Sequence, residues 1–222
     1  MPIILAIAPH ADDETLGCGG TLLRHLHEGD EVHWLIMTTP GQELKLSPER
    51  IKRRQEEIRM VANDYGFAGV HELRFPAIRL DHLPMSDIVG ALSSFFQTIE
   101  PNTLYLPYHN DVHSDHRVTF EASAACAKWF RHPSIRRMLS YETPSETGYG
   151  LPGNGAAFQP HVWVDIDAFL EKKIAILNRF QGEIGEFPFP RSEEVVRSLA
   201  KLRGSESGCL AAEAFMMLRE FV

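Results

Sequence analysis

The sequence predicts an α/β fold with three layers and a mostly parallel central sheet. Strand-like and helix-like patterns alternate through the first two-thirds of the chain, which implies right-handed crossovers between parallel strands. Residues 3–8 form a continuous apolar run, as expected for a strand that is covered on both faces. No repeat or linker divides the 222 residues, so we expect one domain over residues 1–222.

The individual elements follow from local patterns. The segment at residues 31–39 indicates a strand because Val32, Trp34 and Ile36 alternate along it. Ser47 and Pro48 are expected at the N-cap and first position of a charged amphipathic helix. In chain order, strands are expected at residues 3–8, 31–39, 71–75, 103–107, 138–141 and 162–166. Helices are expected at residues 17–28, 48–65, 85–99, 114–130, 167–180, 192–202 and 211–221, which completes a Rossmann-like arrangement.

The composition narrows the class of protein. Lys and Arg number 22 and Asp and Glu number 30, so the formal net charge is −8. An acidic surface argues against a nucleic-acid partner and against docking on an anionic membrane, although one phosphate held by one or two arginines stays compatible with it. Three cysteines do not suggest a disulfide framework. Because no signal peptide or transmembrane run is recognisable, we expect a cytoplasmic chain without a membrane anchor.

The first strand is followed by a polar turn with the sequence PHADDE at residues 9–14. One imidazole and three carboxylates crowd this turn, and like charges so close together repel each other unless a positive group lies among them. A divalent cation is the simplest such group, because histidine and carboxylate ligands suit zinc and other first-row metals. The alternative is that the carboxylates only favour the N-terminus of the following helix, which would leave the histidines unexplained.

A second polar turn, HNDVHSDH at residues 109–116, follows the fourth predicted strand and precedes a helix. Both turns therefore lie at the carboxyl ends of parallel strands, which is the edge where open α/β sheets bind ligands. A catalytic zinc site needs three protein ligands and an open position. The expected ligands are His10, Asp13 and His116. Asp12 would then act as general base, and Asp115 would orient a histidine ring.

Two further segments have more than one interpretation. Residues 17–20, Gly-Cys-Gly-Gly, follow a strand but do not match the dinucleotide-binding pattern, so we attribute them to close packing of a helix on a strand. The simplest interpretation of the charged residues 50–57 is a solvated helix face. The alternative is that Arg53 or Arg54 binds substrate. Arg191 would bind a phosphate or carboxylate, or would cap a loop.

The two polar turns resemble the signatures of the PIG-L/LmbE-like de-N-acetylases, a family of zinc hydrolases that act on N-acetylglucosamine-type substrates. The family has a His-Pro-Asp-Asp-Glu turn and a later His-x-Asp-His. This chain has HADDE at residues 10–14, with Ala11 in place of the usual Pro, and HSDH at residues 113–116. The resemblance spans nearly the whole chain, including residues 158–160, 164–166, 171–173, 188–192 and 212–215.

The resemblance implies the same zinc ligands and the same base, and it adds roles for other residues. His113 would stabilise the oxyanion or donate a proton, so the expected catalytic residues are Asp12, His113 and Asp115. Some relatives have a Tyr oxyanion donor where this chain has Asp111. The candidate substrate contacts are Arg53, Arg54, Asp111 and Arg191.

The expected function is the removal of an N-acyl group, acetyl by resemblance, from an N-acetylglucosamine-type conjugate. Zn²⁺ would activate the attacking water, and Fe²⁺ is the alternative metal. Two other classes stay open. A metal-dependent phosphoesterase would usually need a second metal, and a catalytically silent sugar-binding relative would have no use for Asp12. The expected partner is a small amino-sugar conjugate, and a homo-oligomer is compatible with the sequence.

Overall fold

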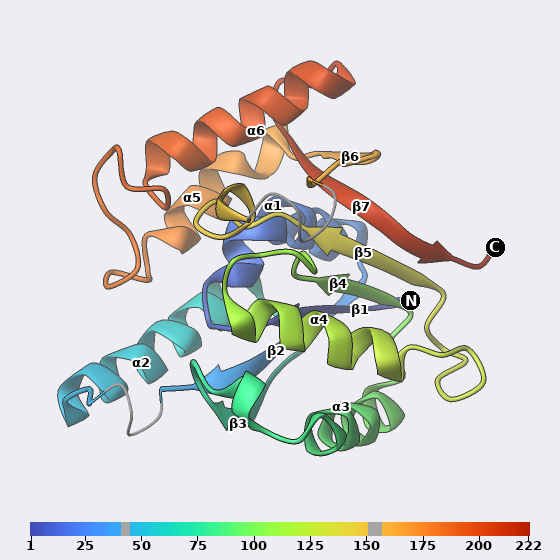
Figure 1. Ribbon diagram of the computed structural model, residues 1–222. Helices are drawn as coiled ribbons and strands as arrows, with labels where there is room; N and C mark the ends of the chain where they lie inside the picture. Colours follow the sequence, from blue (N-terminus) through green and yellow to red (C-terminus); the bar gives the residue numbers. More distant parts are fainter. Residues whose placement is uncertain (41–44, 151–156) are drawn as a thin grey trace.

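Seven strands form one mixed sheet in the computed structural model, which describes residues 1–40, 45–150 and 157–222 (Figure 1). The strands are β1 (Ile3–Ala8), β2 (Glu31–Thr39), β3 (Gly69–Pro76), β4 (Thr103–Leu106), β5 (Arg137–Tyr141), β6 (Val162–Asp165) and β7 (Ala212–Glu220). They lie side by side in the order β3-β2-β1-β4-β5-β7-β6. Strands β1 to β5 are parallel, whereas β7 pairs antiparallel with β5 and β6. The predicted mostly parallel α/β sheet is confirmed.

Helices cover both faces of this sheet. They are α1 (Asp13–Glu28), α2 (Pro48–Tyr65), α3 (Met85–Ile99), α4 (Ser114–Cys126), α5 (Leu170–Leu177) and α6 (Glu193–Ser207). One buried cluster joins α1, α2, α5 and α6 to one face, and a second joins α3 and α4 to the other. Strand β1 serves both clusters, because Ile4 and Ala6 point to the first and Leu5 and Ile7 to the second. Among the described residues, no helix has the length and apolar content needed to span a membrane.

The start of α2 and the packing of α1 agree with the sequence-based expectations. The Ser47 side chain caps α2 by accepting a hydrogen bond from the backbone N–H of Arg50, and Pro48 follows it. In α1, a Cβ atom on Gly17 would lie 2.2 Å from the Tyr141 ring, and one on Gly20 would lie 2.8 Å from Ile166. The glycine-rich segment is therefore explained by close packing of α1 on the sheet.

The segment at residues 211–221 was expected to be a helix and is instead strand β7, so this prediction is wrong. Its residues, AAEAFMMLRE from Ala211 to Glu220, are mostly good helix formers. Intrinsic helix propensity is only a weak preference, and here the chain pairs with β5 on one side and β6 on the other. The predicted helix at 167–180 is also divided, because a 3₁₀ turn at Asp167–Phe169 precedes α5.

Two strand ends position the polar turns. Strands β1 and β4 are parallel neighbours, with Ile4 opposite Thr103 and Ala6 opposite Tyr105. The chain leaves both strands at the same edge of the sheet and continues into α1 and α4 (Figure 1). Helix α1 begins at Asp13, earlier than expected, because the first polar turn itself supplies the first turn of the helix. The two turns thus become neighbours although they are far apart in the sequence.

Candidate metal and active site

The two polar turns bring together two imidazoles and one carboxylate. The Oδ2 atom of Asp13 lies 3.3 Å from Nδ1 of His10 and 3.2 Å from Nε2 of His116. These three ligand atoms all lie within 4.8 Å of one another. Two imidazole nitrogens and a carboxylate oxygen are a donor set that suits a divalent first-row metal, zinc in particular. The three residues expected as ligands therefore fit a metal ion in both chemistry and spacing.

A buried carboxylate lies behind each of these histidines. Nε2 of His10 lies 3.1 Å from Asp115, and Nδ1 of His116 lies 2.8 Å from Asp111. Asp115 is fixed further by the backbone N–H groups of Ile78 and Leu80, at 2.6 and 3.1 Å. Hydrogen bonds of this kind set the tautomer of a metal-binding histidine. They leave Nδ1 of His10 and Nε2 of His116 for a metal.

The protonation of the cluster reflects its surplus of negative charge. Burial alone would lower the pKa of His10, but its hydrogen bonds to Asp115 and Asp13 raise that pKa to about 9. Burial likewise opposes protonation of His116, and the charge of Asp13 raises its pKa well above the ordinary value. Carboxylates that stabilise a protonated imidazole so strongly also favour a cation in its place. The electrostatics therefore agree with the donor set.

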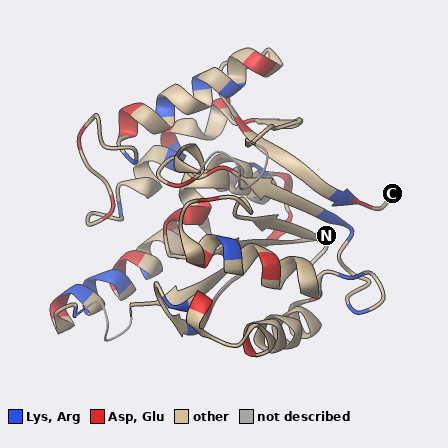
Figure 2. Ribbon diagram, viewed as in Figure 1, with Lys and Arg blue, Asp and Glu red and all other residues tan. Residues whose placement is uncertain are grey.

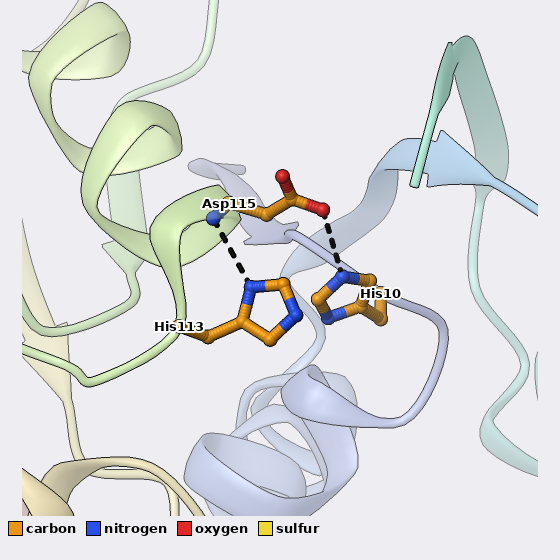
Figure 3. Close-up of side chains that lie close together, drawn as sticks. All are labelled: His10, His113 and Asp115. Atoms are coloured by element: carbon orange, nitrogen blue, oxygen red, sulfur yellow. Dashed lines mark hydrogen bonds and ion pairs between the residues drawn. The ribbon is translucent and has the colours of Figure 1, made fainter. Parts of the chain in front are cut away.

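A second group of three side chains competes with this assignment. His10, His113 and Asp115 also lie close enough to share an ion (Figure 3). However, Nδ1 of His113 accepts the backbone N–H of Asp115 at 3.1 Å, and Asp115 already accepts two backbone N–H groups. The arrangement with Asp13 has fewer competing hydrogen bonds. The group containing Asp13 is therefore the better candidate for holding a metal ion.

His113 caps helix α4 and faces the cleft described below. Burial, followed by the charges of His10 and His116, lowers the pKa of His113 to about 4, so the ring is neutral near pH 7. Since its Nδ1 accepts a hydrogen bond, the single ring proton lies on Nε2. His113 thus offers a neutral N–H donor, the type of group that stabilises a developing oxyanion.

Asp12 is buried, with 2% of its surface exposed, and it lines the cleft. Its φ of 157° is unusual for a residue with a side chain, as is often seen at functional sites. Its Oδ2 accepts a hydrogen bond from Nη1 of Arg191 at 3.1 Å. Burial and the charge of Asp13 raise the pKa of Asp12 to about 7, against the opposing effect of Arg191. This value is in the range that suits a general base.

Glu14, the third carboxylate of the first turn, has a different role. It is fully buried and accepts hydrogen bonds from the Thr15 hydroxyl and from the backbone N–H of Asp12, at 2.6 and 3.2 Å. Burial raises the pKa of Glu14 to about 8. The sequence alone did not separate Glu14 from its neighbours. In the structure, Glu14 stabilises the turn that contains Asp12 through these hydrogen bonds.

A cleft of about 760 Å³ opens over the cluster, and its volume is typical of small-molecule sites, which are roughly 300–1,000 Å³. Its lining includes His10, Asp12, Asp13 and His113. The walls come from α2, the end of β3 and the segment before α6. The lining also contains Arg50 and Glu57, which the sequence favoured only as part of a solvated helix face at residues 50–57. No local motif marks the remaining charged residues of the lining, which are Glu72, Arg74, Glu146 and Glu183.

The four candidate substrate contacts lie in different places. Arg53, Arg54 and Arg191 line the cleft. The Arg54 side chain is 18% exposed and donates to the Ala11 carbonyl at 3.0 Å, so it is not part of a solvated helix face. Asp111 is 1% exposed and is not among the lining residues. Its position behind His116 favours an orienting role over direct contact with substrate.

Both polar turns lie within a segment of the chain that matches a known protein family. A family model for PIG-L, described as GlcNAc-PI de-N-acetylase, matches residues 5–127, which include both polar turns. The chain is 29% identical over 185 residues to the Escherichia coli (strain K12) protein named uncharacterized deacetylase YaiS, covering 81% of this chain and 90% of that protein.

Two further similarities cover almost the whole chain. Diacetylchitobiose deacetylase from Thermococcus kodakarensis is 24% identical over 225 residues, covering 95% of this chain and 80% of that protein. The crystal structure of the conserved protein TT1542 from Thermus thermophilus is 26% identical and superposes with a TM-score of 0.77, covering 100% of this chain and 97% of the other. Since the family model matches more than half of the chain and contains its paired His and Asp turns, the protein belongs to the PIG-L family.

Proposed function

We propose that this protein is a metal-dependent hydrolase that removes an acetyl group from the nitrogen of an N-acetylglucosamine-type conjugate. The observation that carries the proposal is the position of the Asp13 carboxylate between His10 and His116, with a buried carboxylate behind each ring. Membership of the PIG-L family and the names of the relatives, two of which are called deacetylases, support this reaction class.

In this proposal His10, Asp13 and His116 hold one divalent metal. Zn²⁺ is our first choice for these ligands, and Fe²⁺ is the alternative. A bound metal would supply Lewis-acid chemistry, polarising the amide carbonyl and lowering the pKa of water. Asp111 and Asp115 would keep the two rings in the tautomers that the metal needs.

Asp12 moves the proton in this account. Its carboxylate faces the cleft and takes a proton from water as the water oxygen forms a bond to the acetyl carbon. Arg191 fixes the carboxylate by its hydrogen bond at 3.1 Å. When the carbon–nitrogen bond breaks, Asp12 returns the proton to the nitrogen, so the products are acetate and the free amino sugar. Asp12 thus ends in its starting state.

His113 stabilises the charge that develops on the carbonyl oxygen. Its Nε2–H is the proton-bearing atom of a neutral ring held by its bond to the Asp115 backbone. A single donor of this kind is often worth roughly 2.7–4 kcal/mol in the transition state. Because the ring is neutral near pH 7, we assign His113 to oxyanion stabilisation and the proton transfer to Asp12.

An amine-release assay tests the proposed function. The purified protein would be stripped with a chelator, reloaded with Zn²⁺ or Fe²⁺, and incubated with N-acetylglucosamine derivatives and, separately, with phosphate esters. We expect free amine and acetate only from reloaded protein. Phosphate release without amine release would contradict the proposal and favour a phosphoesterase. Equal amine release from stripped protein would contradict the role of the metal.

A further inference from the structure

The segment that follows strand β5 reaches the same edge of the sheet as the two polar turns. Strand β5 is a parallel neighbour of β4, with Ser140 opposite Leu106, so the carboxyl ends of both strands lie at that edge (Figure 1). The chain continues from β5 as residues 142–150. A Cβ atom on Gly150 would lie only 2.9 Å from the carbonyl oxygen of Asn110. The segment after β5 is therefore packed closely against the second polar turn.

One side chain of this segment, Thr147, forms a hydrogen bond with a carboxylate of the candidate site. The Thr147 hydroxyl donates to Oδ1 of Asp111 at 2.6 Å. The same hydroxyl oxygen accepts the backbone N–H of Thr143 at 2.8 Å. A hydroxyl has a single proton, and an ionised carboxylate can only accept hydrogen bonds. Because the Thr143 amide occupies an acceptor position of the hydroxyl, the hydroxyl proton is directed to Asp111.

The two oxygens of Asp111 serve different partners. Oδ1 is bonded by Thr147, and Oδ2 lies 2.8 Å from Nδ1 of His116. The last side-chain torsion of an aspartate is intrinsically broad, so a carboxylate bonded through one oxygen alone keeps rotational freedom. The second hydrogen bond removes that freedom in the case of Asp111. The contacts from Thr147 through Asp111 to His116 thus connect the end of β5 to a candidate metal ligand.

Thr147 itself lies outside the cleft. It is half-buried and is not among the lining residues, although the preceding residue, Glu146, is one of them. An effect of Thr147 on the site therefore passes through Asp111 and not through contact with a substrate. Asp115, the carboxylate behind His10, is held by backbone N–H groups instead. Asp111 receives its second bond from a side chain, so a single substitution can remove that support.

We propose that Thr147 is a positioning residue for the metal site. Its hydroxyl orients the Asp111 carboxylate, which in turn holds the His116 ring in the tautomer and orientation that a metal needs. The inference rests on the proposed function, since it takes His116 to be a metal ligand. Groups that orient a metal-binding histidine in this way raise metal affinity. A site built from the ends of β1 and β4 thus depends on a residue from the end of β5.

Thr147→Val removes the hydroxyl and keeps a branched side chain of similar size. Chelator-treated protein would be titrated with Zn²⁺ against a competing chelator dye. We expect the affinity for Zn²⁺ to fall roughly three- to tenfold, less than the roughly 10- to 100-fold typical of changing a group in direct contact with the ligand. Thr147→Ser keeps the hydroxyl and should retain the wild-type affinity. Thr98→Val on α3 is the control, because that hydroxyl donates to Ser94 of its own helix.

A double-mutant cycle distinguishes positioning from a merely structural role of Thr147. In Asp111→Asn a single amide oxygen replaces two carboxylate oxygens, so it cannot serve both His116 and the Thr147 hydroxyl as the carboxylate does. Adding Thr147→Val to Asp111→Asn should therefore cause no further loss of Zn²⁺ affinity, and the two effects should not be additive. Equal losses from Thr147→Val in both backgrounds would overturn the proposal. Thr147→Ala repeats the cycle if the valine variant has a lowered melting temperature.

Metal binding measured without turnover separates this proposal from the proposed function. Weaker Zn²⁺ binding by Thr147→Val, combined with no amine release by the wild type, would keep the positioning role and sink the deacetylase. Amine release by the wild type, combined with unchanged Zn²⁺ affinity of Thr147→Val at a normal melting temperature, would sink the positioning role and keep the deacetylase. Equal losses of affinity in Thr147→Val and Thr147→Ser would also overturn it, because the hydroxyl would then not be the group that acts.

Discussion

Each of the two candidate metal-binding histidines is held in position by one buried carboxylate. Asp111 and Asp115 contact the ring nitrogens that face away from Asp13. Burial raises the pKa of Asp111, and its bonds to His116 and Thr147 oppose that effect. For Asp115, burial is outweighed by the hydrogen bonds from His10 and two backbone N–H groups, so its pKa is lowered. Both are thus positioning residues for the candidate ligands.

Replacing Asp111 with Asn should weaken metal binding and leave the lining of the cleft unchanged, because Asp111 is not among the lining residues. The neutral amide supports the His116 tautomer less well, and losses of roughly 10- to 100-fold in metal affinity are typical of such changes. Metal titration of the chelator-treated protein measures the effect. The matched control is Glu31→Gln, because Glu31 bonds to Nε2 of His33 at 2.9 Å in a histidine–carboxylate pair outside the cleft and outside every group of described residues that could hold a metal. Equal losses in both variants would argue for a general effect on stability.

Among the single elements, α1 is the one whose first turn contains Asp13, and its glycines let it pack closely against the sheet. Its glycines leave no room for side chains against Tyr141 and Ile166. The backbone also departs from helical geometry at Cys18, whose φ is −141°. Cys18 itself is fully buried, and burial raises the pKa of its thiol well above the ordinary value, which fits a packing residue. Close packing thus fixes the helix whose first turn holds Asp13.

Gly17→Ala should destabilise the fold because the new Cβ would meet the Tyr141 ring at 2.2 Å. Overpacking of this kind costs about 1–3 kcal/mol, measured as the free energy of unfolding in denaturant. The control is Gly90→Ala in helix α3, where nothing lies within 4 Å of the added atom. That change should be neutral or should stabilise the protein by up to about 1 kcal/mol. Comparable effects of both substitutions would contradict the packing account of α1.

In the molecule as a whole, strand β7 connects the C-terminal part of the chain to helix α1 near its N-terminus. Glu213 of β7 accepts hydrogen bonds from the backbone N–H groups of Gly20 and Thr21 at 2.9 and 2.7 Å. It also pairs with the Lys173 ammonium of α5 at 2.7 Å, and both side chains are buried. Positions of both charge signs are spread over many elements of the fold, α2 and α6 among them (Figure 2). Because one sheet contains strands from both ends of the chain, we propose that residues 1–222 act as one domain.

Glu213→Ala should destabilise the protein by about 3–5 kcal/mol, because it leaves the Lys173 charge buried without its partner. Thermal and denaturant unfolding measure the loss. Glu220→Ala, on the same strand, is the control: its side chain is 46% exposed, and its pair with Arg137 is at the surface. Exposed pairs contribute roughly 0–1 kcal/mol. If both substitutions had the same small effect, the buried pair would not hold these elements together.

The parts of the fold and site that the sequence predicted share a physical basis. The strand at Ile3–Ala8, the Ser47 cap and the two polar turns are local patterns, and the parallel topology then brings His10 and His116 to one edge. The β7 strand was not predictable in this way, because its helix-forming residues are overruled by pairing with β5 and β6. Arg74 was missed for the same reason, since its place in the cleft depends on a bulge between two strands.

The proposed mechanism assigns metal binding and proton transfer to different residues. Bound metal and amine release, measured on the same samples of wild type, Asp12→Asn and His116→Ala, test this division. We predict about one metal per chain for the wild type and for Asp12→Asn. Turnover of Asp12→Asn should fall by roughly 100-fold or more, since a general base contributes a factor of that order. His116→Ala should lose both metal and turnover. Near-normal turnover in Asp12→Asn, or undiminished metal binding in His116→Ala, would contradict the account.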